Sequence, residues 1–124
     1  MANLEKGKNG EKLAAKFLKK KKYRILFKNY KTTVGEIDLI AQKGDAVIFV
    51  EVKARASEFF GAPSESVTHH KRRKINQVAS QFLTRHGLHG VECRFDVVEV
   101  LGAGKDSGVE IRHIENAFDS YISW

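Results

Sequence analysis

Two carboxylates and a lysine occur within a short stretch of this sequence. Asp38 lies in one apolar segment, and Glu51 and Lys53 lie in the next. The turn at residues 43–46 is short enough to join the two segments as a β-hairpin. If the middle two residues of this turn form the loop, Asp38 lies opposite Glu51, and Glu36 lies opposite Lys53.

This pairing brings two negative charges together. Directly opposed side chains on a hairpin have Cβ atoms ~5 Å apart, a distance at which like charges destabilise the sheet. A cation such as Mg²⁺ takes oxygen ligands and needs only one or two carboxylates besides water and a substrate phosphate. Lys53 lies on the same face as Glu51, where its charge could polarise a water or neutralise a phosphate. The spacing therefore predicts a metal-dependent site that cleaves phosphodiesters.

The alternative is an ordinary surface hairpin whose Glu and Lys side chains form ion pairs across the two strands. Such a hairpin would not place Asp38 opposite Glu51. A register shifted by one residue would break the proposed site.

Apolar residues are predicted on both faces of this hairpin. One face carries Ile37, Leu39, Ala41, Ile48, Val50 and Val52, and the other carries Ile40, Val47 and Phe49 near the turn. We therefore expect the hairpin to be covered on both sides, with an active cleft at the end away from the turn.

A first helix is predicted over residues 6–21, where Leu13, Ala14, Phe17 and Leu18 form an apolar stripe. Glu11 lies about one turn before this stripe. It either points into the cleft as a further acidic group or is a solvated first-turn glutamate favoured by the helix dipole.

A second helix is predicted from the N-cap Thr68 to about His86, with a buried stripe of Ile75, Val78, Ala79, Phe82 and Leu83. Its first turns carry six basic residues, which are His69, His70, Lys71, Arg72, Arg73 and Lys74. Cations at a helix N-terminus oppose the dipole, and a bound phosphate would account for their presence there. The alternative is a solvated basic face. Gln77 is a weaker candidate for orienting a phosphate or water, because a surface glutamine needs no such role.

Three further strands are predicted at residues 23–31, 94–100 and 109–114. The strand at residues 94–100 follows a helical crossover and should be parallel to its neighbour. Within it, Asp96 shares a face with Arg94 and should pair with it.

Two segments are predicted to be irregular. Residues 54–65 form a loop beside the site, where Phe59 and Phe60 either stack on bases or pack on the body of the protein. The aromatic tail at residues 117–124 either closes the core or forms a dimer contact.

Length and composition indicate one domain that favours an anionic partner. The chain has 124 residues, of which 42% are hydrophobic, and a net charge of +7. Nucleic acid and an acidic membrane surface are both compatible with this charge.

Without a long apolar run or signal segment, we expect a soluble, cytoplasmic protein. The single Cys93 is expected to be a small buried hydrophobe. His86 and His89 indicate helix capping and loop polarity rather than a zinc site.

Several motifs together point to a known group of proteins. They are Gly10-Glu11, Asn29-Tyr30, Gly-Glu-Ile-Asp-Leu-Ile at residues 35–40, and the segments 49–55, 71–75 and 94–97. With them, nearly the whole chain resembles the PD-(D/E)xK nuclease superfamily and, more closely, the YraN-like family of small bacterial predicted endonucleases, distantly similar to archaeal Holliday-junction resolvases. The expected fold is a single α/β, restriction-endonuclease-like domain over residues 1–124. Helices flank a central mixed five-stranded sheet in the order α-β-β-β-α-β-β.

The resemblance implies Mg²⁺- or Mn²⁺-dependent hydrolysis of DNA. Asp38 and Glu51 would bind the metal, helped by Glu11 and by the backbone carbonyl of Val52, and Lys53 would position the attacking water. The implied nucleic-acid-binding residues are Arg55, His70, Lys71, Arg72, Arg73, Lys74 and Gln77.

These basic residues and the ribbon at residues 54–68 would grip the DNA backbone without reading bases, which suits a structure-selective enzyme acting on branched or junction DNA. Resolvases of this kind act as dimers, so a homodimer is a candidate state. Two alternatives keep the fold without this activity: a non-catalytic nucleic-acid-binding protein, and an RNA- or ribosome-associated factor.

Overall fold

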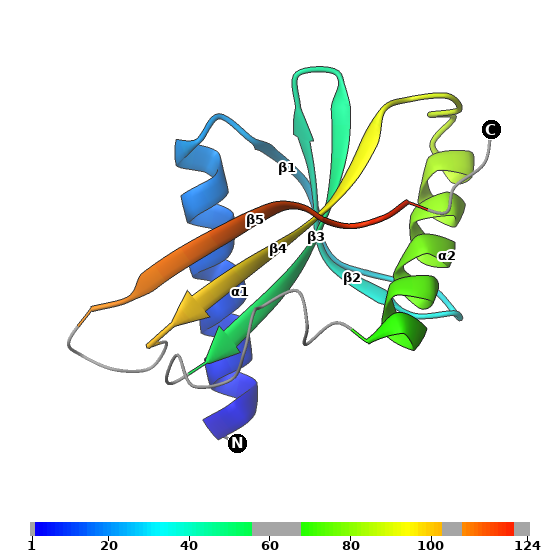
Figure 1. Cartoon of the computed structure of the whole chain (residues 1–124). Helices are drawn as coiled ribbons and strands as arrows, with labels where there is room; N and C mark the ends of the chain where they lie inside the picture. The colour runs from blue at the N-terminus through cyan, green and yellow to red at the C-terminus, as the bar shows by residue number, and fades with distance from the viewer. Residues whose placement is uncertain (1, 56–67, 103–107, 121–124) are drawn as a thin grey trace.

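The structure is a computed structural model that describes residues 2–55, 68–102 and 108–120, with side chains from residue 9 onward. The chain begins with helix α1 (Ala2–Lys20), which is followed by strands β1 (Arg24–Lys31), β2 (Glu36–Lys43) and β3 (Ala46–Arg55). Helix α2 (His69–Arg85) then precedes strands β4 (Cys93–Leu101) and β5 (Glu110–Phe118) (Figure 1). This order confirms the predicted α/β arrangement.

One mixed sheet contains the five strands in the order β1-β2-β3-β4-β5. Strands β3 and β4 are parallel, as predicted, because α2 returns the chain across the sheet between them. The other neighbouring strands are antiparallel. Strand β3 is longer than predicted: Ala54 and Arg55 pair with β4 instead of starting a loop.

The β2–β3 hairpin has the predicted register. Its pairs run from Lys43 opposite Ala46 to Leu39 opposite Val50. Gly44 has a φ of 60°, the left-handed backbone conformation that a tight two-residue turn requires.

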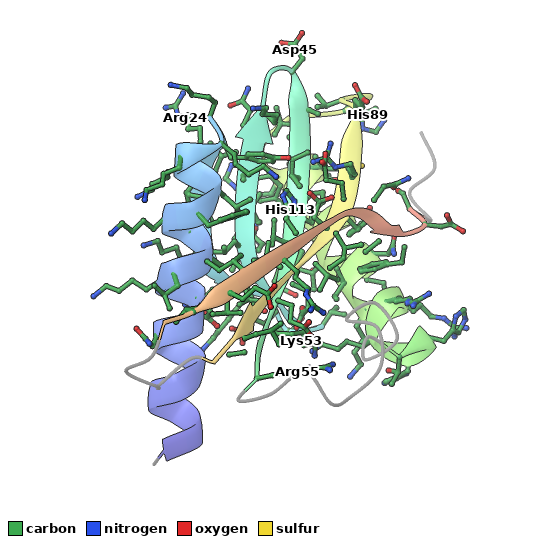
Figure 2. The ribbon with its side chains drawn as sticks, turned by 60° about the vertical axis from the view of Figure 1, so that its left-hand side comes forward. Arg24, Asp45, Lys53, Arg55, His89 and His113 are labelled. Carbon is green, nitrogen blue, oxygen red and sulfur yellow. The ribbon has the colours of Figure 1, made fainter. Side chains whose placement is uncertain are left out.

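Apolar side chains are buried on both faces of the sheet, as predicted, and α1 and α2 cover opposite faces (Figure 1). The α1 cluster includes Ala14, Leu18, Leu39, Ala41, Ile48, Val50, Val98 and Val100. The α2 cluster includes Ile40, Val47, Phe49, Ile75, Val78, Phe82, Phe95 and Val97. Charged residues of the hairpin are thereby placed toward its ends. Figure 2 shows Asp45 in the turn at one end, and Lys53 and Arg55 at the other.

Ile37 departs from the predicted alternation. The sequence pattern places Ile37 on the face of Leu39, yet Ile37 packs in the α2 cluster and Leu39 in the α1 cluster. The β1 residue paired with Ile37 is Tyr30, whose ring centroid lies 5.2 Å from that of Phe82 in α2. Asn29 lies between the β1 residues that pair with Leu39 and Ile37, and its φ of 52° is a left-handed conformation, which is unusual in a strand. The break lies at the open end of the hairpin.

Helix α2 begins and ends close to its predicted limits. The side chain of the N-cap Thr68 accepts a hydrogen bond from the N–H of Lys71 at 3.2 Å. His86 is the C-cap, and its N–H donates to the carbonyl oxygen of Phe82 at 3.0 Å. The capping interpretation of His86 is thereby confirmed.

Several smaller predictions fall in other parts of the chain. Cys93 is half-buried against the α2 cluster, and burial raises the pKa of its thiol. Phe118 belongs to that cluster, so this part of the tail closes the core. Phe59, Phe60 and the tail from residue 121 lie outside the described residues. No helix in the described part of the chain is long and apolar enough to cross a membrane.

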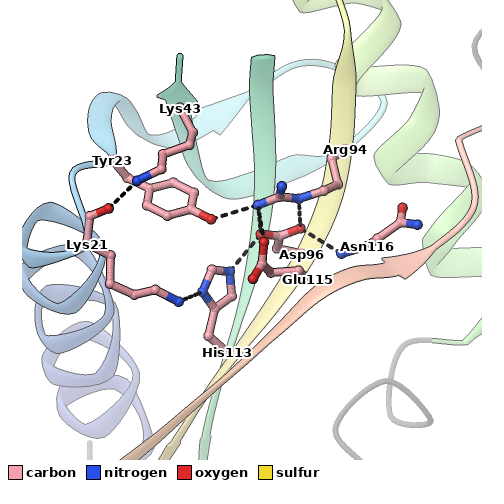
Figure 3. Close-up of polar contacts among 8 residues, drawn as sticks. All are labelled: Lys21, Tyr23, Lys43, Arg94, Asp96, His113, Glu115 and Asn116. Carbon is pink, nitrogen blue, oxygen red and sulfur yellow. Dashed lines mark hydrogen bonds and ion pairs between the residues drawn. The ribbon is translucent and has the colours of Figure 1, made fainter. Parts of the chain in front are cut away.

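A buried polar network joins β4 to β5 (Figure 3). Asp96 is fully buried and accepts hydrogen bonds from Nε and Nη2 of Arg94 at 2.8 and 2.9 Å, as predicted. It also accepts from Nε2 of His113 at 2.7 Å and from the N–H of Asn116 at 2.9 Å. Burial alone would raise the pKa of Asp96, but these hydrogen bonds outweigh it and lower the pKa.

The same network reaches the segment that follows α1. Because lysine only donates, Nδ1 of His113 accepts from Nζ of Lys21 at 2.8 Å. Nη2 of Arg94 donates to the hydroxyl of Tyr23 at 2.7 Å. Since these groups find their partners within the fold, we assign the network to fastening β4 and β5 to the end of α1.

Candidate functional site

Asp38 lies beside Glu51 at the open end of the β2–β3 hairpin. The paired residues of the hairpin run to Leu39 and Val50, and the two carboxylates follow at the next position. Oδ2 of Asp38 accepts a hydrogen bond from the backbone N–H of Val52 at 2.8 Å. This contact fixes the carboxylate of Asp38 against β3.

The pKa of Asp38 shows how unfavourable a negative charge is at this position. It is raised from 3.8 to about 8. Burial is the largest cause, and the negative charge of Glu51 is the next. The charge of Glu11 raises the pKa further, whereas the hydrogen bond from Val52 lowers it. The fold therefore holds two carboxylates together, as the hairpin register predicts.

Two lysines flank Glu51, which is only 7% exposed. Nζ of Lys71 lies 2.7 Å from Oε1 of Glu51, and Nζ of Lys53 lies 3.9 Å from the same atom. Burial lowers the pKa of Lys53, and the neighbouring Lys71 lowers it further. Burial also acts to lower the pKa of Lys71, but its hydrogen bond and attraction to Glu51 outweigh burial and raise it. Lys53 thus lies beside Glu51, as predicted.

A cleft of about 270 Å³ opens between the hairpin and α2 at this point. It is lined by Gly35, Glu36, Asp38, Glu51, Lys71, Lys74 and Ile75. Carboxylates lie on the sheet side of the cleft, and lysines lie on the helix side. Such a cleft can hold a cation and an anionic phosphate next to each other.

Glu11 contributes to this site through its charge. Gly10 permits a close approach between α1 and β3, because a Cβ at this position would lie 2.7 Å from the Cβ of Ala54. Glu11 is partly exposed, and its charge acts on Asp38. Within the described residues, no three His, Cys, Asp or Glu side chains are grouped as ligands for a metal ion. A direct bond from Glu11 to a metal therefore stays a prediction.

The predicted basic cluster at the start of α2 divides between different sides of the helix. Its two lysines line the cleft. The guanidinium of Arg72 instead lies over the ring of Phe118, 5.4 Å from the ring centroid. Nη2 of Arg73 lies 3.4 Å from Nε2 of His69 at the surface. His70 and Gln77 are also exposed. A helix has 3.6 residues per turn, so a continuous run of cations cannot all face one cleft.

Arg55 is engaged elsewhere. Its Nε lies 3.1 Å from Oε2 of Glu99, a β4 side chain that is only 2% exposed. Nη1 of Arg112 lies 3.9 Å from the other carboxylate oxygen. A contact between Arg55 and nucleic acid would thus compete with an ion pair of the fold. Glu99 was not predicted from the sequence, although an acidic residue within an apolar strand is a signal of a buried partner.

Comparison with known proteins places this site within a family. The family model described as "Uncharacterised protein family UPF0102" matches residues 10–100, a range that contains both carboxylates, both lysines and all of α2. The chain belongs to the UPF0102 family.

Its relatives match along almost their full length. The chain is 48% identical to a UPF0102 protein of Clostridioides difficile, over 95% of this chain and 100% of the relative. It is 47% identical to one of Desulfosudis oleivorans, over 94% and 92% of the two chains. It is also 48% identical to one of Alkaliphilus oremlandii, over 94% and 99%. These UPF0102 proteins are therefore close to this chain in length.

Proposed function

We propose that this UPF0102 protein is a metal-dependent DNA endonuclease of the PD-(D/E)xK type that selects branched or junction DNA by its shape. The observation that carries this proposal is the pair of adjacent carboxylates, Asp38 and Glu51, with the ammonium groups of two lysines beside Glu51. A purely structural hairpin gains nothing from placing these two acids together.

The residues of the cleft fit Mg²⁺ or Mn²⁺. Hard divalent cations take oxygen ligands, and Mg²⁺ is commonly held by one or two carboxylates together with waters and substrate phosphates. Asp38 and Glu51 supply two carboxylates, and the strongly raised pKa of Asp38 marks a place where positive charge is needed. The carbonyl of Val52 and the carboxylate of Glu11 are the further candidate ligands. A divalent cation held there would supply Lewis acidity toward the water and the phosphate.

The lysines would act on the water and the phosphate. Lys53 lies next to Glu51 and has a lowered pKa, so it can exchange a proton more readily than an exposed lysine and orient the attacking water. Lys71 is paired with Glu51 in the structure. The ammonium group of Lys71 would be able to contact the phosphate instead if a cation neutralised Glu51. Hydrolysis forms a bond from the water oxygen to phosphorus and breaks one P–O ester bond. The attacking water loses a proton, and the leaving sugar oxygen takes up a proton and becomes a hydroxyl group.

Charge and the kind of side chain present support a nucleic-acid substrate, and the resemblance to the nuclease superfamily implies that it is DNA. The chain carries a net charge of +7, and the cations at the cleft are lysines, which contact phosphates without reading bases. Binding of this kind responds to the course of the backbone rather than to the base sequence. A homodimer would present two clefts to two DNA strands. The homodimer stays a prediction, as does the cytoplasmic location.

A second candidate is a non-catalytic nucleic-acid-binding protein. The contact of 2.7 Å between Lys71 and Glu51 favours it, because this ion pair already neutralises one of the two acids. In that case the two acids would have a structural role, and the basic side chains of α2 would bind nucleic acid without cleaving it.

Cleavage of labelled branched, nicked and flapped DNA in Mg²⁺ or Mn²⁺ tests the proposal. We expect Asp38→Asn and Lys53→Met to lower the cleavage rate by ~100-fold or more. Asp45→Asn and Lys28→Met are matched controls at exposed positions and should cut like the wild type. Equal cleavage by all four variants would indicate a contaminating nuclease and refute the proposal. Salt-sensitive binding without any cleavage would favour the second candidate.

A further inference from the structure

A second hollow on the molecule is larger than the candidate cleft. This groove has a volume of about 840 Å³, compared with about 270 Å³ for the cleft. It is lined by Lys31, Thr32, Thr33, Ser80, Gln81, Thr84 and Arg85, from the end of β1, the β1–β2 connection and the second half of α2.

The chemistry of this groove suits a phosphodiester backbone. Its lining contains two cations, four hydroxyl groups and one amide, and no carboxylate is among the lining residues. Lysine, arginine, serine, threonine and glutamine are the side chains that commonly contact phosphates and sugars of nucleic acids. Six of the seven lining residues are exposed, so their polar groups are available to a partner at the surface.

The groove continues the candidate cleft along the same helix. Lys74 lines the cleft, and Gln81 and Arg85 line the groove seven and eleven residues later. With 3.6 residues per turn these three lie on one face of α2, and the exposed Gln77 lies between the first two. From Lys74 to Arg85 the helix rises by ~16 Å, the axial length of about five phosphates in one strand of a duplex.

The β1–β2 connection lines both the cleft and the groove opposite α2, and hydrogen bonds hold its shape. Gly35 lines the cleft, and Thr32 lines the groove. The N–H of Thr32 donates to the carbonyl of Gly35 at 2.8 Å, and the hydroxyl of Thr32 accepts from the N–H of Val34 at 3.1 Å. The wall is thus a closed turn whose shape is set before a partner binds, which lowers the entropic cost of binding.

We propose that this groove carries a DNA strand along α2 as it leaves the candidate cleft. The proposal extends the function proposed above and rests on it for the identity of the strand. The groove would hold the sugar-phosphate backbone through Lys31, Arg85 and the hydroxyl groups between them. It would thereby set the direction in which DNA crosses the molecule.

Binding of a fluorescein-labelled DNA to the whole protein in EDTA, followed by fluorescence anisotropy at several salt concentrations, tests this assignment. We expect the double variant Lys31→Ala/Arg85→Ala to bind ~10-fold or more weakly, and the slope of log K against log salt to fall by about two. Lys16→Ala/Lys20→Ala removes the same charge from exposed positions on α1 and is the matched control. Its slope should stay close to that of the wild type.

A second variant, Gln81→Glu, tests the groove by adding one negative charge at an exposed position. It should also weaken the binding of DNA and leave the thermal midpoint of unfolding unchanged.

Equal slopes for the groove variant and the α1 control, or no binding of DNA by the wild type, would overturn the assignment. Because binding is measured without a divalent cation, the assignment of the groove can be correct even if the protein does not cleave DNA. Conversely, cleavage can be demonstrated while the groove variants bind DNA normally. An RNA competitor that displaces the DNA from the wild type at lower concentration than a matched DNA would assign the groove to RNA and reject the choice of DNA.

Discussion

Replacing Asp38 by asparagine should stabilise the metal-free protein even though it removes the proposed activity. Asparagine has nearly the same shape, and its side-chain oxygen can still accept the hydrogen bond from the N–H of Val52. It carries no charge to repel Glu51. The substitution therefore removes the electrostatic cost of the site and keeps its packing.

The expected size of the effect follows from the pKa of Asp38. The folded protein retains this proton up to about pH 8, whereas an unfolded chain releases it near 3.8. Between these values the folded state binds more protons, so the stability of the wild type falls as pH rises, and the fall ends above about pH 8. A full one-proton difference is worth ~1.4 kcal/mol per pH unit. Since Glu51 shares the interaction and Asp38 is partly exposed, we expect the advantage of Asp38→Asn to grow by ~1–2 kcal/mol between about pH 5.5 and pH 7.5.

Urea unfolding in EDTA at a series of pH values measures this advantage as a shift in the midpoint with an unchanged m-value. Addition of Mn²⁺ provides a second measurement. A ligand that binds only the folded state adds ~2.7 kcal/mol at one hundred times its Kd. The wild type should gain stability in this way, and Asp38→Asn should gain little.

The control is Asp45→Asn, which removes a carboxylate from the exposed β2–β3 turn and should change stability by less than ~0.5 kcal/mol at any pH. If Asp38→Asn were less stable than the wild type throughout the pH range, the carboxylate of Asp38 would be a stabilising group. The description of the site as two acids held together against their repulsion would then be wrong.

Two further predictions concern the fold that supports the site. Gly10→Val should lower the free energy of unfolding by ~1–3 kcal/mol, because any Cβ at this position would lie 2.7 Å from the Cβ of Ala54. Urea unfolding of this variant and of the surface variant Lys16→Ala measures the effect. Equal stability of the two variants would contradict the close approach of α1 to β3. Asp96→Asn should cost ~3 kcal/mol or more at neutral pH, since it leaves Arg94 without its buried partner. The lowered pKa of Asp96 means that its contribution is present above the unfolded pKa and is lost as pH falls, so the cost measured by unfolding should shrink toward acidic pH. A cost that does not vary with pH would count against this ion pair.

Much of the hairpin and helix arrangement could be predicted because the forces that determine it are local. A two-residue turn sets the register of the strands that it joins, so the position of Gly44 was sufficient to bring Asp38 beside Glu51. The side chain of Thr68 marked the start of α2, because an N-cap hydroxyl contacts the N–H three residues later. Apolar residues on both faces of the hairpin likewise indicated that both faces would be covered.

The tertiary structure decided which of the remaining side chains face the site. Lys71 reaches Glu51 across 20 residues of sequence, whereas the adjacent Arg72 lies over Phe118, and this division depends on how α2 is rotated against the sheet. The pairing of Arg55 with the buried Glu99 depends on the register of two parallel strands joined by a long crossover. The groove likewise exists only where α2 meets the β1–β2 connection. Local patterns determine what an element is and where it begins, but contacts between distant segments depend on how whole elements pack, which local patterns do not encode.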